Sequence, residues 1–282
     1  MSKNLDDRVV ADFGQEWLRF DQAQLEETEL KEIFQLYFAI FPWQKLPVDS
    51  IGFDLGCGSG RWAREVAKRV GTLHCIDPSD AIEVAKRNLS DHENCVFHRA
   101  SVADIPLPDS CADFGYSLGV LHHVPDTQAG IRACVQKLKP GAPFLIYLYH
   151  AFEDRPLSLY ILWKLSNLVR SVLCRTPHGF KCAFSEVAAV LFYWPLARMA
   201  RVVELLGLSV HNFPLSQYRH RSFYVMRTDA LDRFGTRLEK RFTRAEIQAM
   251  MTQAGLTNIH FSESAPFWVG LGFKKERDTE HL

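Results

Sequence analysis

A glycine-rich turn between a predicted strand and a predicted helix most constrains how this chain can fold. The segment FDLGCGSGRW, residues 53–62, has glycines at positions 56, 58 and 60 and runs directly into the helical pattern of residues 61–70. A strand, a tight glycine turn and a helix form half of a nucleotide-binding unit. The turn therefore predicts an α/β fold in which the glycines either hold a ligand or only allow a tight connection.

The pattern around the turn alternates between strands and helices. Predicted strands cover residues 50–55, 72–76, 95–99, 112–118 and 142–149, and predicted helices cover residues 61–70, 81–89 and 127–138. Strands that alternate with helices form parallel sheets covered on both faces. Residues 48–150 are therefore expected to form one α/β core.

Two helical regions flank this core. Residues 1–47 form a predicted N-terminal helical segment with apolar residues at helical spacing. Residues 151–240 break the alternation with two predicted helices, at residues 157–173 and 186–207. The second region is thus a helical insert that follows the fifth strand.

The α/β pattern returns in residues 241–282. A helix is predicted there, with Thr243 as its N-cap, Glu246 completing a capping box and Gly255 ending it. Two strand-like segments follow. This part is expected to complete the sheet of the core.

Charge and composition exclude several classes of protein. The chain has 33 Lys and Arg against 33 Asp and Glu, so a general nucleic-acid binder is not expected. The charge is uneven, because residues 151–240 carry 13 basic and 7 acidic residues. Seven cysteines without a C-x-x-C pair indicate a reduced, cytoplasmic protein.

The N-terminus and the hydropathy pattern bear on membrane insertion. MSKNLDDRVV lacks the apolar region of a signal peptide. No uncharged run of about twenty apolar residues occurs, so no transmembrane span is predicted.

The glycine spacing and two acidic residues bear on the ligand. The turn reads G-x-G-x-G, whereas an NAD-binding turn reads G-x-G-x-x-G. Asp77 ends the second strand, where a carboxylate can accept both hydroxyls of a ribose, and NAD and S-adenosylmethionine share that ribose. Asp54, just before the turn, can meet a cationic ligand end. The spacing and Asp54 favour S-adenosylmethionine.

In four stretches the chain resembles the class I S-adenosylmethionine-dependent methyltransferases. They are FDLGCGSG (53–60), CIDPS (75–79), DIPLPDSCADFGYSLGVLHHVPD (104–126) and KLKPGAPFLIYLY (137–149). The best-fitting branch acts on small molecules and is similar to ubiquinone-biosynthesis enzymes. The resemblance implies a Rossmann-like, mostly parallel sheet with helices on both faces and S-adenosylmethionine as the cofactor.

The resemblance also implies a set of cofactor-binding residues. The family often has an acidic residue after the third strand for the adenine amine, and this chain has Ser101 there. The expected contacts are Asp54, Gly56, Cys57, Gly58, Ser59, Gly60, Arg61, Asp77, Pro78, Ser101, Val102 and Leu118. Gly119 is expected to line the same site.

Three histidines are candidates for a general base. His122 and His123 follow the fourth strand, and His150 follows the fifth. A neutral imidazole can take a proton from a hydroxyl near pH 7. His150 is favoured because it ends a predicted strand and begins the insert. For His122 and His123, the alternative to catalysis is that they orient the loop in which they lie. No metal site is expected, because no third ligand lies at metal spacing.

The acceptor is expected to meet Tyr149 and the insert. The insert residues named for substrate binding are Tyr218, Arg219, Arg221, Tyr224 and Arg227. Arginines with tyrosines suit an anionic or sugar-type acceptor. The alternative is a solvated basic surface or a set of ion pairs.

The predicted function is methyl transfer to a small molecule, at oxygen first and carbon second. The alternatives are a non-catalytic scaffold with this fold and an NAD-dependent oxidoreductase. The apolar insert helices carry Lys164, Arg170, Arg198 and Arg201. The apolar residues of these two helices are interpreted as part of a protein core rather than as a peripheral membrane contact. The oligomeric state is left open.

Overall fold

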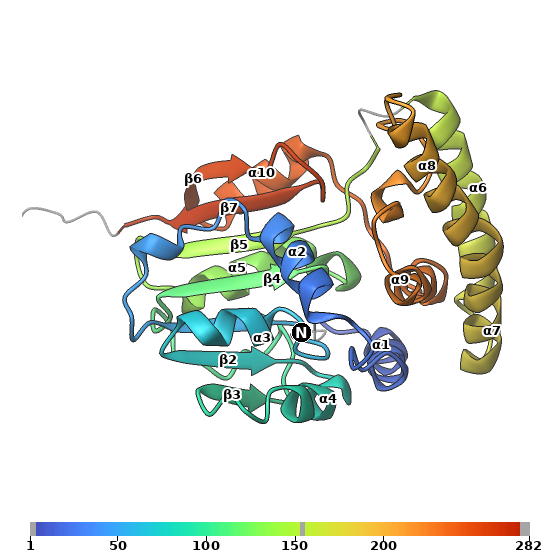
Figure 1. Ribbon diagram of the computed structural model, residues 1–282. Helices are drawn as coiled ribbons and strands as arrows, with labels where there is room; N and C mark the ends of the chain where they lie inside the picture. The colour runs from blue at the N-terminus through green and yellow to red at the C-terminus, as the bar shows by residue number, and fades with distance from the viewer. Residues whose placement is uncertain (1–3, 153–155, 277–282) are drawn as a thin grey trace, which may run out of the picture. The chain divides into compact units, whose positions relative to one another are not determined.

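The computed structural model describes residues 4–152 and 156–276 (Figure 1). The chain divides into two compact units. Of the described residues, the first unit comprises 4–21, 31–151 and 238–276, and the second comprises 22–30, 152 and 156–237. Residues 22–30 thus group with the insert rather than with the rest of the N-terminal segment.

The first unit is built on a seven-stranded sheet of order β3-β2-β1-β4-β5-β7-β6. The strands are β1 Ile51–Leu55, β2 Thr72–Ile76, β3 Cys95–His98, β4 Phe114–Leu118, β5 Pro143–Tyr147, β6 Leu256–Phe261 and β7 Val269–Lys274. The first five strands are parallel, and β7 runs antiparallel to both of its neighbours. This is the mostly parallel sheet that the alternating pattern predicts.

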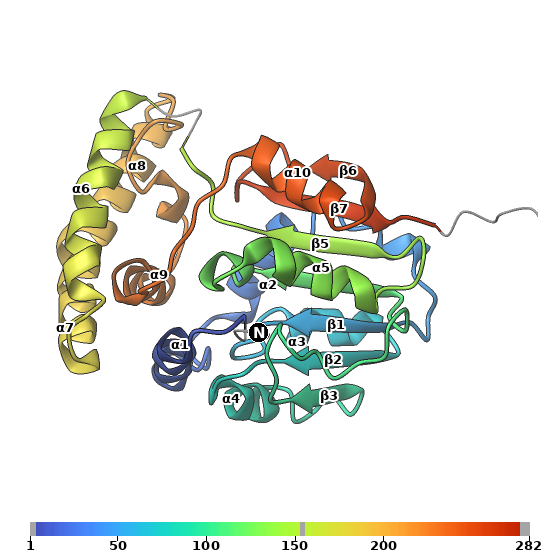
Figure 2. The same cartoon turned by 180° about the vertical axis from the view of Figure 1, so that it is seen from behind.

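Helices cover both faces of the sheet, as the sequence predicts. The α-helices with residues in this unit are α1 Asp7–Arg19, α2 Glu27–Tyr37, α3 Ala63–Val66, α4 Ala81–Asn88, α5 Thr127–Lys137 and α10 Arg244–Gln253. Short 3₁₀ turns are η1 Trp43–Lys45, η2 Ala67–Arg69 and η3 Leu121–His123. Figure 1 shows α2 and α3 in front of the sheet, and Figure 2 shows α5 and α10 on its other face.

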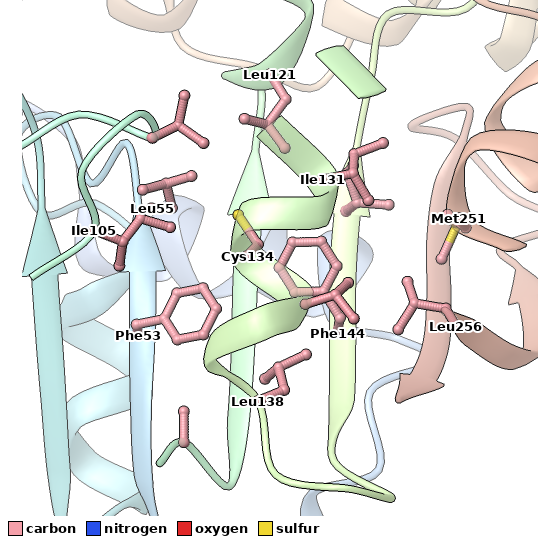
Figure 3. Close-up of a cluster of buried hydrophobic side chains, with 14 of the residues drawn as sticks. Phe53, Leu55, Ile105, Leu121, Ile131, Cys134, Leu138, Phe144, Met251 and Leu256 are labelled. Atoms are coloured by element: carbon pink, nitrogen blue, oxygen red, sulfur yellow. The ribbon is translucent and has the colours of Figure 1, made fainter. Parts of the chain in front are cut away.

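Alternation along the strands builds a separate apolar layer on each face. One layer joins Phe53, Leu55 and Phe144 to the buried sides of α5 and α10 (Figure 3). On the other face, the Phe38 ring meets Tyr116 of β4 at 5.2 Å between ring centroids. The sheet is thus buried on both sides, which fits its run of apolar strand residues.

The predicted capping box of α10 is present. The Thr243 side chain accepts a hydrogen bond from the Glu246 backbone N–H at 3.1 Å, and the Glu246 carboxylate accepts one from the Thr243 N–H at 2.7 Å. Gly255 follows the helix with φ +92°. This left-handed conformation favours glycine and ends the helix as predicted.

The second unit is helical. Its elements are α6 Leu157–Leu173, α7 His178–Ala188, the π-helical turn η4 Ala189–Tyr193, α8 Trp194–Leu205, the short turn η5 Ser216–Tyr218 and α9 Phe223–Gly235. α6, α7 and η4 pack against α9. A small apolar cluster joins η4, α8 and α9 and consists of Ala189, Tyr193, Ala197, Met226 and Ala230.

Two features of this unit differ from the sequence prediction. The second insert helix begins at His178, eight residues before the predicted start. α9 was not predicted, because its sequence is polar and aromatic without a clear apolar stripe. One helical stretch, His178–Leu205, has the length and hydropathy of a membrane span, although 39% of its most apolar window is buried within the protein.

Candidate active site

The turn after β1 requires glycine at three positions because of its backbone conformation. Gly56, Gly58 and Gly60 have φ values of +77°, +54° and +81°, which L side chains rarely adopt. A Cβ at Gly56 would also lie 2.3 Å from the Val120 side chain. The glycines therefore serve a sharp turn that brings backbone N–H groups to the carboxyl edge of the sheet.

Asp77 fastens this turn to the end of β2. Its Oδ2 accepts a hydrogen bond from the Gly58 N–H at 3.0 Å, and its Oδ1 accepts from the N–H and the hydroxyl of Ser79 at 2.9 and 2.6 Å. Burial raises the pKa of Asp77, and these hydrogen bonds and the charge of Arg99 oppose the rise. One lone pair on Oδ2 is left for a ligand hydroxyl.

Asp54 is buried on the sheet face that carries Tyr116. Its side chain is 1% exposed, and its Oδ2 has no hydrogen-bond partner among the described residues. Burial raises the pKa of Asp54 well above its ordinary value, with the nearby Tyr116 hydroxyl acting in the opposite direction. Cys57 is also buried; although the Cys75 thiol lowers its pKa, the net result with burial is a value of about 11.

The remaining cofactor candidates surround the same edge. The Ser59 hydroxyl is buried without a hydrogen-bond partner among the described residues, and Pro78 is half-buried beside Asp77. Val102 belongs to the apolar core cluster, and Ser101 caps its own loop by accepting a hydrogen bond from the Ala103 N–H at 3.1 Å. Leu118 is buried at the end of β4.

Gly119 marks open space beside the turn. Its φ is +79°, and a Cβ built on it would meet no atom within 4 Å. β1 and β4 are neighbours whose next strands lie on opposite sides, and ligands of α/β sheets bind at such a switch point. The gap therefore lies where a ligand is expected.

Helix α1 packs on the turn, a role that the sequence did not reveal. A Cβ at Gly58 would lie 3.0 Å from the Trp17 Nε1, and the Arg61 guanidinium lies 5.5 Å from the Trp17 ring and 5.2 Å from the Trp62 ring. One turn earlier, Phe13 contacts His123 with 4.9 Å between ring centroids. The available signal was the pair of aromatic residues four positions apart on one helix face.

A second cluster forms where β4 and β5 end. His122 is fully buried, and its ring lies 3.9 Å from both the His123 ring and the Tyr149 ring. Neither ring nitrogen of His122 has a hydrogen-bond partner among the described residues. Burial, together with His123 and the charge of Arg241, lowers the pKa of His122 well below its ordinary value. This imidazole is neutral near pH 7.

One ring nitrogen of His123 and the charged groups beside the cluster are engaged. The Nδ1 of His123 lies 2.6 Å from the Leu238 carbonyl oxygen. The Arg241 guanidinium lies 5.1 Å from the Tyr149 ring and donates to the Glu239 carboxylate at 2.8 Å. Arg241 and Glu239 are further site residues that sequence reasoning missed, because they join the histidines only through the fold.

His150 lies apart from this cluster. The strand was predicted to reach residue 149, but β5 ends at Tyr147, so Tyr149 and His150 lie in the segment after it. The His150 ring lies 6.2 Å from Phe267 and 6.3 Å from Trp268, and its carbonyl oxygen accepts from Arg241 at 3.3 Å. The structure therefore brings together His122, His123 and Tyr149, and leaves His150 beside the aromatic residues before β7.

The predicted substrate residues of the insert make contacts inside the second unit. Arg227 forms a two-pronged pair with Glu186 at 2.7 and 2.6 Å, and Arg219 donates to Glu204 at 2.8 Å. The remaining three are also engaged: the Tyr224 hydroxyl accepts from the Gln22 N–H at 2.9 Å, the Tyr218 ring contacts Tyr193, and the Arg221 carbonyl accepts from Arg198. These contacts agree with the ion-pair alternative.

The first unit has the chemistry that an adenosyl ligand requires. Asp77 retains a lone pair for a ribose hydroxyl, and two buried oxygens, on Asp54 and Ser59, lack partners among the described residues. Buried polar groups are nearly always paired, so such orphans indicate a bound group. Gly119 leaves room beside them.

Comparison with known proteins points to one family. Residues 53–146 match the family described as "Methyltransferase domain". The chain is 28% identical over 171 residues to the ubiquinone biosynthesis O-methyltransferase of Pseudomonas entomophila, covering 58% of this chain and 69% of the relative. It is 24% identical over 205 residues to the 2-phytyl-1,4-naphtoquinone methyltransferase of Nostoc sp., covering 68% and 82%.

Solved structures agree on the fold. Human N-acetylserotonin methyltransferase in complex with SAM superposes with a TM-score of 0.53 at 18% identity, covering 94% of this chain and 57% of that one. An O-methyltransferase family protein from Burkholderia thailandensis also gives a TM-score of 0.53, at 12% identity, covering 91% and 59%. The methyltransferase domain at residues 53–146, the two relatives, the glycine turn and Asp77 thus support an S-adenosylmethionine-dependent methyltransferase, and the sheet order and the solved structures show the class I fold.

Proposed function

We propose that this methyltransferase methylates a hydroxyl oxygen of a small aromatic molecule and that His122 is its general base. The proposal rests on the fully buried His122 ring, whose two nitrogens have no hydrogen-bond partner among the described residues. A neutral imidazole presents one donor and one acceptor. A hydroxyl of the acceptor molecule would satisfy the acceptor nitrogen, which explains why a polar ring is kept there without a partner in the protein.

The surroundings of His122 favour a flat acceptor. Tyr149 lies against the His122 ring, and Tyr147 lies 5.9 Å from Tyr149 and 5.1 Å from Tyr37, measured between ring centroids. Aromatic side chains bind aromatic ligands by stacked and edge-to-face contacts. The names of the two relatives, for ubiquinone and for a phytyl-naphthoquinone, support an acceptor built on an aromatic ring in quinone biosynthesis.

The chain's own residues would contribute binding and proton transfer. S-adenosylmethionine, when bound, supplies a methyl group on a sulfonium and leaves as a neutral thioether. The glycine turn, Asp54 and Asp77 would hold it, with Ser59, Arg61 and Leu118 beside them. His122 would accept the hydroxyl proton as the acceptor oxygen forms its bond to the methyl carbon. The charge of Arg241 disfavours protonated His122 and would promote release of that proton.

Other roles remain proposals. We propose His123 as the residue that positions His122, since it contacts that ring and is tied to the Leu238 carbonyl. A binding role for the arginines and tyrosines of the insert stays a prediction, and the ion pairs of Arg219 and Arg227 support a structural role instead. The four-part division of the chain and a cytoplasmic location also stay predictions.

The test compares matched histidine variants in a methylation assay. Phenolic, catecholic, carboxylate and sugar acceptors are incubated with S-adenosylmethionine, and methylated products are identified by mass spectrometry. With the acceptor so found, His122→Asn should lower kcat by roughly 10²–10⁴-fold, the usual contribution of a general base. His150→Asn should change kcat only slightly.

Calorimetric titration of both variants with S-adenosylmethionine separates loss of chemistry from loss of folding. Unchanged cofactor affinity in His122→Asn shows an intact first unit. The proposal fails if His150→Asn has the larger defect in kcat, or if only sugar or carboxylate acceptors are methylated.

A further inference from the structure

The second unit exposes an unusual amount of apolar surface. Of the 24 large apolar side chains exposed among the described residues, 19 lie between residues 157 and 208. We call them the apolar surface: Leu157, Tyr160, Ile161, Leu162, Leu165, Leu168, Val169, Val172, Phe180, Val187, Val190, Leu191, Phe192, Trp194, Met199, Val202, Leu205, Leu206 and Leu208. Apolar exposure on this scale marks an interaction surface.

Helix α6 shows that the exposure follows the helical repeat. Leu157, Ile161, Leu165, Leu168 and Val172 recur at intervals of three and four residues, so they share one side of the helix. All five are exposed, and Leu168 is 66% exposed. An amphipathic helix of a globular protein normally turns such a stripe inward, which is why the sequence indicated a core.

Three basic side chains of the same helices are engaged within the unit. Arg170 of α6 donates to the carbonyl oxygens of Thr236 and Arg237 at 2.8 and 3.2 Å, and Lys181 of α7 is only 3% exposed. Arg198 of α8 donates to two carbonyl oxygens, those of Arg219 and Arg221, at 3.0 Å each. These three basic side chains are thus engaged within the unit while much apolar side-chain surface is exposed, which suits contact with an apolar environment.

The exposed charged side chains among these apolar residues are all basic. Within residues 156–208, the exposed charged side chains are Lys164, Arg175 and Arg201. The two carboxylates of this range, Glu186 and Glu204, are both paired with arginines. Basic residues among exposed apolar ones are typical of helices that lie in the interface of an anionic membrane.

We propose that the apolar surface of the second unit binds the surface of a lipid bilayer that contains anionic phospholipids. A second copy of the chain fits less well, because a symmetric contact would bring Lys164, Arg175 and Arg201 toward their own like charges. The helix His178–Leu205 lies on the bilayer rather than crossing it, since Glu186 keeps its pair with Arg227 of α9. This inference does not depend on the acceptor.

The test is flotation of the purified full chain with lipid vesicles. Vesicles of phosphatidylcholine alone are compared with vesicles that also contain phosphatidylglycerol. The wild-type chain should float with the anionic vesicles and less with the neutral ones. The double variant Leu165→Asp/Leu168→Asp should bind anionic vesicles roughly 100-fold more weakly, about tenfold for each leucine removed. Lys164→Glu/Arg201→Glu should lose the preference for phosphatidylglycerol, about fivefold for each basic side chain.

Val48→Asp is the matched control. This substitution also places a carboxylate at an exposed apolar position, since Val48 is 93% exposed, but Val48 lies in the first unit. The Val48→Asp variant should therefore float like the wild type. Equal affinities for S-adenosylmethionine and equal circular dichroism spectra establish that each variant is folded. The proposal is overturned if the wild type floats with neither kind of vesicle, or if Leu165→Asp/Leu168→Asp floats as well as Val48→Asp. A wild-type dimer that this double variant dissociates, without vesicle binding, assigns the apolar surface to a second copy.

Discussion

Replacing Gly119 by alanine tests where the cofactor lies. Gly119 has φ +79°, and a Cβ there would meet no protein atom within 4 Å. The cost to folding is therefore conformational only, about 1 kcal/mol for an alanine in the left-handed region. The added methyl group would occupy the space that the ligand is expected to fill. Overpacking a well-fitted site typically costs about 1–3 kcal/mol, so cofactor affinity should fall by roughly 5- to 150-fold.

Gly255→Ala is the matched control for this experiment. Gly255 also lies in the first unit, has φ +92° and leaves a Cβ without neighbours within 4 Å, but it ends α10. Both variants should lose about the same stability in urea unfolding. Only Gly119→Ala should bind S-adenosylmethionine and its demethylated product more weakly in calorimetric titration. Wild-type affinity in Gly119→Ala, or an equal loss in Gly255→Ala, would refute the placement of the cofactor beside β4.

Four further predictions rest on the described contacts. Asp77→Ala removes three hydrogen bonds from buried donors; it should cost about 1–3 kcal/mol in urea unfolding and abolish micromolar cofactor binding, and retained affinity would contradict the assignment. Because burial lowers the pKa of His122 well below 6.5, the acid limb of the kcat–pH profile should lie below pH 6.5, and an inflection above that value would exclude His122 as the base. The unfolded state binds the His122 proton more readily, so the free energy of unfolding should fall as pH drops below 6.5, and less so in His122→Asn. Arg227→Ala breaks a pair whose side chains are 27% and 29% exposed; it should cost about 1 kcal/mol in thermal unfolding without changing the KM for the acceptor, whereas a raised KM at unchanged stability would indicate substrate binding.

Local rules predicted most of the sheet and its turn. The turn at Gly56, Gly58 and Gly60 follows from the glycines themselves, which adopt positive φ readily. The capping box of α10 needs only a glutamate three residues after Thr243. The strand pattern is similarly local, since apolar runs bounded by turns identify buried parallel strands. These features could be predicted because little beyond the segment itself decides them.

The geometry of the histidines could not be predicted from the sequence. His150 has the favourable position at a predicted strand end, but β5 ends at Tyr147, so strand alternation does not place the rings of Tyr149 and His150. His122 owes its low pKa to burial, to the neighbouring His123 and to the charge of Arg241, and no local sequence pattern joins His122 to Arg241. The contact of Trp17 with Gly58 depends in the same way on how α1 packs.

The exposed apolar side of the second unit could not be predicted for a different reason. An amphipathic pattern gives the apolar side of a helix but not what covers that side. In α6 the stripe from Leu157 to Val172 is exposed, and the bonds of Arg170 take the inner side. α9 was not predicted because its sequence shows no clear apolar stripe, although its Met226 and Ala230 belong to the apolar cluster of this unit.

The position of β7 determines when this enzyme can finish folding. β5 pairs with β7, yet the whole second unit, residues 152–237, is encoded between them. During synthesis the five parallel strands therefore emerge with β5 as a bare edge, and the backbone of Pro143–Tyr147 stays unpaired on that side until Val269–Lys274 leaves the ribosome. A chain cut short before Val269 keeps that edge, and with it a strand of buried-type residues that can recruit other chains. Among the described residues, β7 is thus the strand that covers the open edge of β5.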